Sequence, residues 1–135
     1  GTGSSSFVAE VRQKYQNIVQ FHGYLKRSVF FDMIDVLIVP SLWNEPFGRI
    51  IIEAFNYGVP VIGTERGGIP EVIEEGKTGY LYNPDNKDSL MNAIAKFSAD
   101  PNRLQSMRNN CFNQSAKFAP VKIAEKYIEI FTNML

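Results

Sequence analysis

The sequence predicts an α/β fold in which a partial parallel sheet is flanked by helices. Short β-rich runs alternate with longer segments of helical period, which is typical of parallel strands joined by crossover helices. The run 36–39 is apolar at every position, as expected for a strand covered on both faces. The 135 residues, 44% of them hydrophobic and 21% charged, suffice for one globular domain with its own core.

The first third of the chain contains two predicted helices and two predicted strands. Apolar residues recur at helical spacing over 7–15, which predicts the first helix. The apolar residues Ile18, Val19 and Phe21 predict a strand that ends near His22 and Gly23. A short apolar helix over 28–34 then leads to the second strand, over 36–39.

Two further strands and two helices are predicted in the middle of the chain. The spacing of apolar residues predicts a helix over 46–57, with Gly58 as its stop. The next strand is expected over 59–64, and a glycine-rich turn and a short helix lead on to Gly76. A fourth strand is expected over 79–82, so the sheet should contain about four strands.

The remainder of the chain is predicted to be helical. One apolar face runs from Asn86 to Asp100, and Asp100 is expected to cap the next helix with Pro101 at its first position. That helix is expected over 101–118, and Pro120 begins a final one. An apolar stripe marks the final helix at Ile123, Tyr127, Ile130, Phe131 and Met134. The simplest interpretation is that this stripe belongs to the core, and the alternative is that part of it is exposed.

Composition excludes several classes of protein. Fourteen basic residues balance fourteen acidic ones, so no global field attracts nucleic acid or an anionic membrane. The single cysteine, Cys111, forms no internal disulfide, and no run of about 18 apolar residues indicates a transmembrane helix. These features indicate a reducing, cytosolic setting. Residues 1–6 do not resemble a secretory signal and are interpreted as a tag or a disordered start.

Two carboxylates, Glu45 and Glu53, form the centre of the candidate site. Glu45 is expected on the loop after the strand 36–39, and Glu53 about one to two turns inside the following helix. Both can then face one crevice at the carboxyl edge of the sheet, where open α/β sheets bind ligands. An ionised carboxylate is an acceptor with two oxygens, so neighbouring hydroxyls of a sugar or a ribose are the expected ligands.

The first helical turn lies between these carboxylates and offers backbone N–H groups at Phe47, Gly48 and Arg49, which attract anions. A carboxylate that accepts hydrogen bonds from hydroxyls would thus lie on either side of an anion site. This arrangement matches the order sugar, phosphate and ribose in a nucleotide sugar. Spacing alone fits an alternative equally well. In that alternative Glu45 is a first-turn carboxylate favoured by the helix dipole, and Glu53 faces solvent.

Four motifs in order carry a resemblance to a known family. The strings EPFGRIIIEA, GVPVI, GGIPE and GKTGYLYNPDN resemble the donor-binding domain of group 1 (family 4) retaining glycosyltransferases with the GT-B fold. The resemblance extends from about Ile18 to the C-terminus. It implies a Rossmann-like sheet and a role in polysaccharide biosynthesis. It also implies retaining transfer of a sugar from a UDP- or GDP-sugar to an acceptor hydroxyl, with no metal and no cofactor.

The resemblance also implies roles for individual residues. Glu45, the catalytic candidate, matches the glutamate that holds hydroxyls of the donor sugar, and Glu53 matches the one that holds the ribose. The backbone of Phe47, Gly48 and Arg49 matches the turn that contacts sugar and phosphates. The segment that lines the nucleobase is matched by His22, Gly23, Tyr24 and Leu25.

The positions at which this sequence departs from the family pattern are as informative as the positions that match it. The family carries an Arg and a Lys that neutralise the diphosphate leaving group, and this sequence has no counterpart for either. We expect the first strands of the family's donor domain to precede Gly1, and its acceptor domain, for a glycan or glycolipid, to precede those strands. Residues 1–3 fit the glycine turn that closes one of these strands. We therefore expect a piece of a donor domain that is inactive alone. In the intact protein we expect a cytoplasmic location, with membrane association as an option.

Alternative functions remain open at this stage. A nucleotide-sugar epimerase or a phosphorylase has the same fold. A non-catalytic nucleotide-binding or protein-interaction module would place the glutamates on the surface and dock a partner on the final helix. A receiver-like signalling domain is disfavoured, because the acidic cluster that it needs at its first strand is absent.

Several other residues near the motifs have two interpretations each. Trp43 and Phe47 flank Glu45 and can stack on a sugar, although large aromatic residues more often pack in a core or an interface. Gly67 and Gly68 fit either a simple turn or a nest of N–H groups for a phosphate. Arg66, on the same loop, is a candidate for phosphate contact.

Overall fold

The computed structural model describes residues 4–134, and its chain divides into two compact units, Gly1–Phe30 and Phe31–Leu135. The glycine turn expected at 1–3 lies outside the described residues. The first unit contains helix α1 (Ser5–Tyr15), capped by Ser4, whose hydroxyl accepts a hydrogen bond from the amide of Phe7 at 3.4 Å.

The strand predicted over 18–21 is wrong, because residues 4–30 contain no strand. The amides of Ile18 and Val19 both donate to the carbonyl oxygen of Tyr15, at 2.9 and 2.8 Å, so the chain leaves α1 in a turn. A strand also needs a neighbour to share its hydrogen bonds, and none is present among residues 4–30. Ile18 is accordingly 83% exposed.

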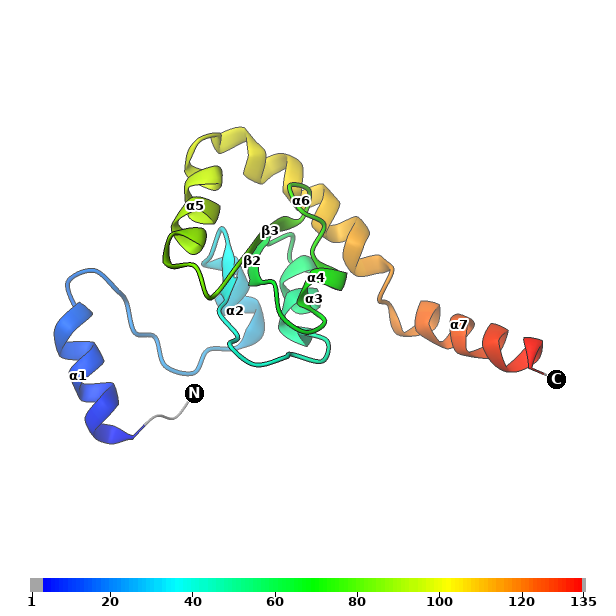
Figure 1. Ribbon diagram of the computed structural model, residues 1–135, viewed down its shortest axis with the longest axis horizontal. Coiled ribbons are helices and arrows are strands. Elements are labelled where there is room, and N and C mark those ends of the chain that lie inside the picture. The colour runs from blue at the N-terminus through cyan, green and yellow to red at the C-terminus, as the bar shows by residue number, and fades with distance from the viewer. Residues whose placement is uncertain (1–3, 135) are drawn as a thin grey trace. The chain divides into compact units, whose positions relative to one another are not determined.

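The second unit is built on a parallel sheet of three strands in the order β1-β2-β3 (Figure 1). These strands are β1 (Leu37–Val39), β2 (Val61–Thr64) and β3 (Gly79–Tyr82). The register places Leu37 opposite Val61, and Val61 opposite Gly79. All three strands lie within the segments that the sequence predicts, so the α/β class and the partial parallel sheet are confirmed. The expected number of about four falls to three, because the segment 18–21 does not pair.

Helices cover both faces of this sheet at β2. The expected cover on both faces is wrong for β1, where Ile38 is 41% exposed. Ile62 packs in a cluster with residues of helices α5 (Lys87–Ser98) and α6 (Pro101–Ala116) on one face. The next residue of β2, Gly63, faces the opposite side, where a Cβ would lie 2.6 Å from Ile69 of α4 (Ile69–Val72). Each fully buried Ile or Phe of this core stabilises the fold by about 1.5–3 kcal/mol. The unbroken burial of β2 agrees with its apolar sequence.

Helix α3 (Arg49–Phe55) begins later than the sequence predicts. Gly48 is its N-cap in the left-handed region, with a φ of +67°, and the loop before it is not helical. The expected stop is confirmed at Gly58, whose φ is +69°. Short helix α2 (Arg27–Asp32) overlaps the segment predicted over 28–34, but it begins one residue earlier and ends two residues earlier.

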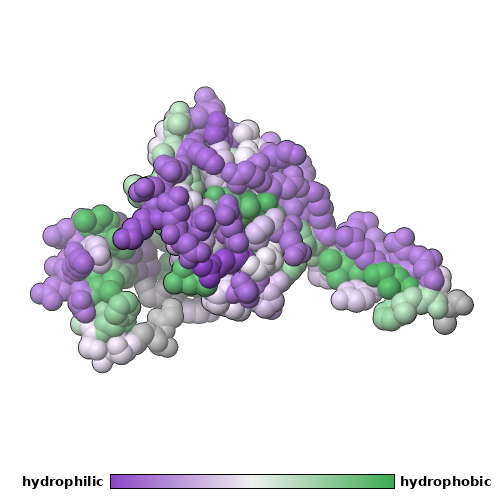
Figure 2. Space-filling model, viewed as in Figure 1, coloured by the Kyte–Doolittle hydropathy of each residue, from purple (hydrophilic) through white to green (hydrophobic). Residues whose placement is uncertain are grey.

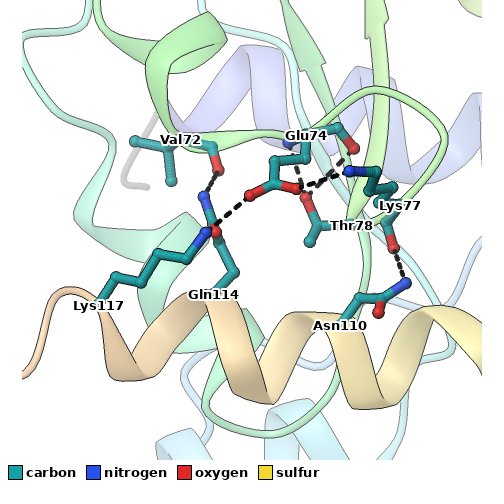
Figure 3. Close-up of polar contacts among 7 residues, drawn as sticks. All are labelled: Val72, Glu74, Lys77, Thr78, Asn110, Gln114 and Lys117. Atoms are coloured by element: carbon teal, nitrogen blue, oxygen red, sulfur yellow. Dashed lines mark hydrogen bonds and ion pairs between the residues drawn. The ribbon is translucent and has the colours of Figure 1, made fainter.

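Side chains of α6 hold the loop between α4 and β3 (Figure 3). Gln114 donates a hydrogen bond to the carbonyl oxygen of Val72 at 3.0 Å, and Asn110 donates to that of Lys77 at 3.2 Å. The start of α6 follows the sequence, since the Asp100 carboxylate accepts from the amide of Asn102 at 3.0 Å. This loop is therefore fixed by long-range contacts.

The final helix, α7 (Pro120–Asn133), has no buried residue. Tyr127 is 59% exposed and Phe131 is 64% exposed, so the interpretation of its apolar stripe as core is wrong. Figure 2 shows hydrophobic residues gathered along α7. Within residues 4–134, no helix combines the length and the apolar character needed to cross a bilayer.

Candidate functional site

Three loops follow the three strands of the second unit. Residues 40–48 follow β1, 65–68 follow β2 and 83–86 follow β3. Because the strands are parallel, their carboxyl ends lie at the same edge of the sheet, which is where open α/β sheets bind ligands. Glu45 lies on the first of these loops, as the sequence predicts.

The first two loops are joined by hydrogen bonds. The buried Thr64 donates its hydroxyl to the carbonyl oxygen of Ser41 at 3.0 Å. The amide of Gly68 donates to the carbonyl oxygen of Glu45 at 2.7 Å. The backbone of the Glu45 loop is therefore held from the side of β2 near its start, at Ser41, and at Glu45 itself.

Both glycines of the second loop are needed for this close approach. A Cβ on Gly67 would lie 2.4 Å from the carbonyl oxygen of Glu45, and one on Gly68 would lie 2.4 Å from that of Pro46. Gly67 also has a φ of +58°, a conformation that residues with side chains rarely adopt. The geometry favours the turn interpretation, in which two backbone segments pack directly on each other.

The side chain of Glu45 lies beside the start of α3. A Cβ on Gly48 would lie 3.7 Å from Cγ of Glu45, and Glu45 is half-buried. No side-chain hydrogen bond from the N-cap residue satisfies the amides of the first turn of α3. A carboxylate acceptor and uncapped backbone donors therefore lie next to each other at this edge.

Glu53, the second carboxylate, is half-buried on α3. Helix periodicity places it on the same face as Arg49, four residues earlier. Arg49 is exposed and directly follows Gly48. Glu53 thus lies one helical turn beyond the segment that contains Glu45, which matches the order expected from the sequence.

The two aromatic residues that flank Glu45 differ in their surroundings. Phe47 packs edge-to-face on Phe118, with ring centroids 5.5 Å apart. Trp43 is 59% exposed and adjoins Leu42, which is 68% exposed. The packing interpretation therefore suits Phe47 and does not suit Trp43.

Arg66 joins all three loops, a role that sequence reasoning missed. Its guanidinium donates to the carbonyl oxygen of Leu42 at 2.9 Å and to both carboxylate oxygens of Asp85 at 2.8 and 2.9 Å. Leu42 follows β1, Arg66 follows β2 and Asp85 follows β3. Nineteen residues separate the two charges, so no local pattern announces the pair.

The residues expected to line a nucleobase belong to the first unit. Gly23 has a φ of +69°, and Tyr24 is 97% exposed. His22 is exposed in the segment after α1. In the described chain, no group of three His, Cys, Asp or Glu side chains is placed to hold a metal ion.

A hollow of about 650 Å³ near the amino end of β3 is lined by neither Glu45 nor Glu53, and Lys96, Asp100 and Arg103 contribute to its lining. Lys96 pairs with Glu75 at 3.0 Å, and Arg103 donates to the hydroxyl of Tyr80 at 2.5 Å. Because both cations have partners, this hollow is a weaker candidate for an anion than the carboxyl edge.

Cys111, the single cysteine, is not a nucleophile in this fold. It is fully buried, and this burial raises the pKa of its thiol to about 12, against the opposing charge of Arg108. A thiol with such a pKa stays protonated at neutral pH, whereas nucleophilic cysteines react as thiolates.

Comparisons with known proteins show the family of the chain. The family model described as glycosyl transferases group 1 matches residues 9–114. The chain is 33% identical over 105 residues to spore coat protein SA of Bacillus subtilis, covering 75% of this chain and 27% of that protein. It is 32% identical over 105 residues to a lipopolysaccharide 1,2-N-acetylglucosaminetransferase of Salmonella typhimurium, covering 77% of this chain and 28% of that protein.

A solved structure shows the same fold. HepE of Anabaena in complex with UDP matches with a TM-score of 0.83 and 28% identity, covering 98% of this chain and 38% of HepE. HepE in complex with UDP-glucose matches with a TM-score of 0.78. The chain spans about a quarter of the length of the two curated relatives. From the family model and these relatives, the chain belongs to the group 1 glycosyltransferases, and its fold is that of their C-terminal domain.

Proposed function

We propose that this chain binds the donor of an enzyme that transfers a sugar from a UDP- or GDP-sugar to an acceptor hydroxyl, with retention of anomeric configuration. One observation carries the proposal. The Glu45 side chain lies beside Gly48 and the uncapped first turn of α3, at the carboxyl edge of a parallel sheet. The match to HepE, which is solved with UDP and with UDP-glucose, adds support.

The two carboxylates divide the donor between them in this proposal. Glu45 accepts hydrogen bonds from hydroxyls of the sugar, and Glu53 accepts them from the ribose. The backbone amides of Phe47, Gly48 and Arg49 face the phosphates between these groups. Gly48 has no side chain that would keep a phosphate away from these amides.

The nucleobase is assigned to a separate segment. His22, Gly23, Tyr24 and Leu25 line it in the proposal, on the basis of their match to the family segment. The exposed ring of Tyr24 is free to stack on a planar base. The proposal leaves both uridine and guanosine donors open.

The chemistry itself needs groups beyond this stretch. Departure of the nucleoside diphosphate develops negative charge on phosphate, and preorganised cations stabilise that charge. The Arg and Lys that serve this purpose in the family have no match in residues 1–135. We therefore propose that the stretch alone binds donor weakly and transfers no sugar, and that it requires neither a metal nor a cofactor. An acceptor glycan or glycolipid would be bound by another part of the enzyme.

Ligand-observed NMR of the chain against UDP-sugars and GDP-sugars tests this proposal. We expect weak binding of one nucleotide class, and we expect Glu53→Ala to abolish it. Glu129→Ala, which removes an exposed carboxylate from α7, is the matched control and should bind as the unmodified chain does.

Three results would contradict the proposal. Equal binding by Glu53→Ala would remove Glu53 from the site. Absence of binding, together with concentration-dependent association in sedimentation, would favour the alternative of a protein-interaction module, with the exposed stripe of α7 as its contact surface. Sugar transfer by the 135 residues alone would contradict the inactivity that we propose.

A further inference from the structure

We propose that Arg66, held by Asp85, is a positioning residue that fixes the loop carrying Glu45. The inference rests on the proposed function of that loop in donor binding. In this inference Arg66 positions the loop that carries Glu45 and does not contact the donor itself.

The contacts of Arg66 suit a fixed spacer between loops. One terminal nitrogen of the guanidinium donates to the carbonyl oxygen of Leu42 at 2.9 Å, and the other donates to both oxygens of Asp85. A guanidinium is planar and keeps its charge, so these directions are set by its geometry. Lysine lacks the planar fork and does not reproduce both contacts at once.

Arg66 also completes a series of donors along the chain that leaves β2. Thr64, Arg66 and Gly68 are two residues apart, and each donates to the carbonyl oxygen of a residue on the Glu45 loop. The acceptors are Ser41, Leu42 and Glu45, in the same order. Arg66 extends this series to Asp85 on the loop after β3.

The exposure of the Arg66–Asp85 pair indicates that the pair positions the Glu45 loop and contributes little to the stability of the fold. The Arg66 side chain is 33% exposed and the Asp85 side chain is 76% exposed. Ion pairs this open to water contribute little to folding. The side chains of Leu42 and Trp43 are exposed, so core packing does not hold this part of the loop and its backbone depends on such contacts.

A loop that is ordered before binding improves affinity. Without Arg66, the residues before Glu45 would have to be ordered when the donor binds, which weakens affinity by the entropy of that step. The pair therefore acts on affinity for the donor although neither side chain touches it.

Trp43 offers a direct reporter, because it is the only tryptophan of the chain and follows Leu42. Time-resolved fluorescence anisotropy of the chain without ligand measures the nanosecond motion of this one side chain. Arg66→Lys and Asp85→Asn are the test variants, with far-UV circular dichroism to verify folding. Lys122→Met breaks an exposed ion pair on α7, with Glu125, and is the matched control.

We expect a larger amplitude of fast motion at Trp43 in both test variants and no change in Lys122→Met. The dissociation constant of the bound nucleotide sugar should rise by about threefold to tenfold in both, as expected when about one side chain more must be ordered on binding. Because Asp85 is exposed, Asp85→Asn decides the outcome if Arg66→Lys does not fold.

Two results would overturn the inference. One is unchanged Trp43 anisotropy in both variants. The other is weaker binding in Arg66→Lys but unchanged or tighter binding in Asp85→Asn, which would make Arg66 a direct phosphate ligand released from Asp85. Failure of the unmodified chain to bind any UDP- or GDP-sugar would instead contradict the proposed function, while the anisotropy would still decide whether the pair holds the loop.

Discussion

The amide of Gly68 donates a 2.7 Å hydrogen bond to the carbonyl oxygen of Glu45, across 23 residues of sequence. The bond joins the two glycines of the loop after β2 to the loop that carries the central carboxylate of the candidate site. The position of Glu45 is therefore decided as much by glycines after β2 as by its own neighbours.

Gly67→Ala should destabilise the protein more than Gly76→Ala. Both glycines have a positive φ, +58° and +75°, so both substitutions cost about 1–2 kcal/mol in backbone strain. A Cβ on Gly67 would also lie 2.4 Å from the Glu45 carbonyl oxygen, whereas one on Gly76 would have no atom within 4 Å. The collision should add about 1–3 kcal/mol. Urea unfolding of the two variants measures the difference, and equal loss would contradict the close packing.

Glu45→Gln should weaken donor binding and leave the fold intact. Loss of hydrogen bonds to a charged acceptor costs about 1.5–3 kcal/mol, which corresponds to more than tenfold in the dissociation constant. Titration of the nucleotide sugar by NMR measures this change, and circular dichroism verifies the fold. Glu129→Gln is the control, and an unchanged constant in Glu45→Gln would exclude Glu45 from the site.

Stability should fall in acid partly through Glu74. A hydrogen bond from Lys117 at 2.9 Å is the main cause that lowers the pKa of Glu74 below its ordinary 4.5. A carboxyl group with a lowered pKa in the folded state stabilises the fold above pH 4.5 and loses that contribution as pH falls through the lowered value.

Lys117→Met tests this assignment by urea unfolding between pH 7 and pH 3. The variant should lose stability at pH 7, and its stability should depend less on pH below 4.5 than that of the unmodified chain. Lys126→Met, on α7, serves as the control. Parallel pH profiles for the unmodified chain and Lys117→Met would contradict the assignment.

Cys111 should react with a thiol reagent only when the fold opens. Burial raises its pKa to about 12, and its side chain is fully enclosed. At pH 8 the reaction of the native chain with a disulfide reagent should be slow and should accelerate through the urea transition, in step with circular dichroism. Rapid modification of the native chain would show that α6 detaches from the sheet.

Sequence reasoning predicted the features that local chemistry decides. The run 36–39 contains a strand because every residue is apolar, and Asp100 caps α6 because its carboxylate reaches an amide two residues away. The segment 18–21 has similar apolar residues, but a strand also depends on a neighbour that the segment itself does not encode. Its pairing was therefore beyond local reasoning.

The candidate site likewise has local features that the sequence predicts and long-range features that it does not. The spacing of Glu45 and Glu53 around Gly48 is local and was predicted in its order along the loop and helix. The contact between Arg66 and Asp85 joins loops after different strands, and it depends on the register of the whole sheet. The exposure of α7 also depends on the rest of the fold, since the same stripe would suit a buried helix.

Because Thr64, Arg66 and Gly68 donate hydrogen bonds to the loop 40–48, the segments 64–68 and 40–48 depend on each other structurally. A segment 40–48 taken from a relative would arrive without the hydroxyl, the guanidinium and the bare backbone that hold it here. An exchange of segments that is meant to transfer substrate preference between relatives should therefore succeed when 64–68 and 40–48 are exchanged together. It should fail when either segment is exchanged alone.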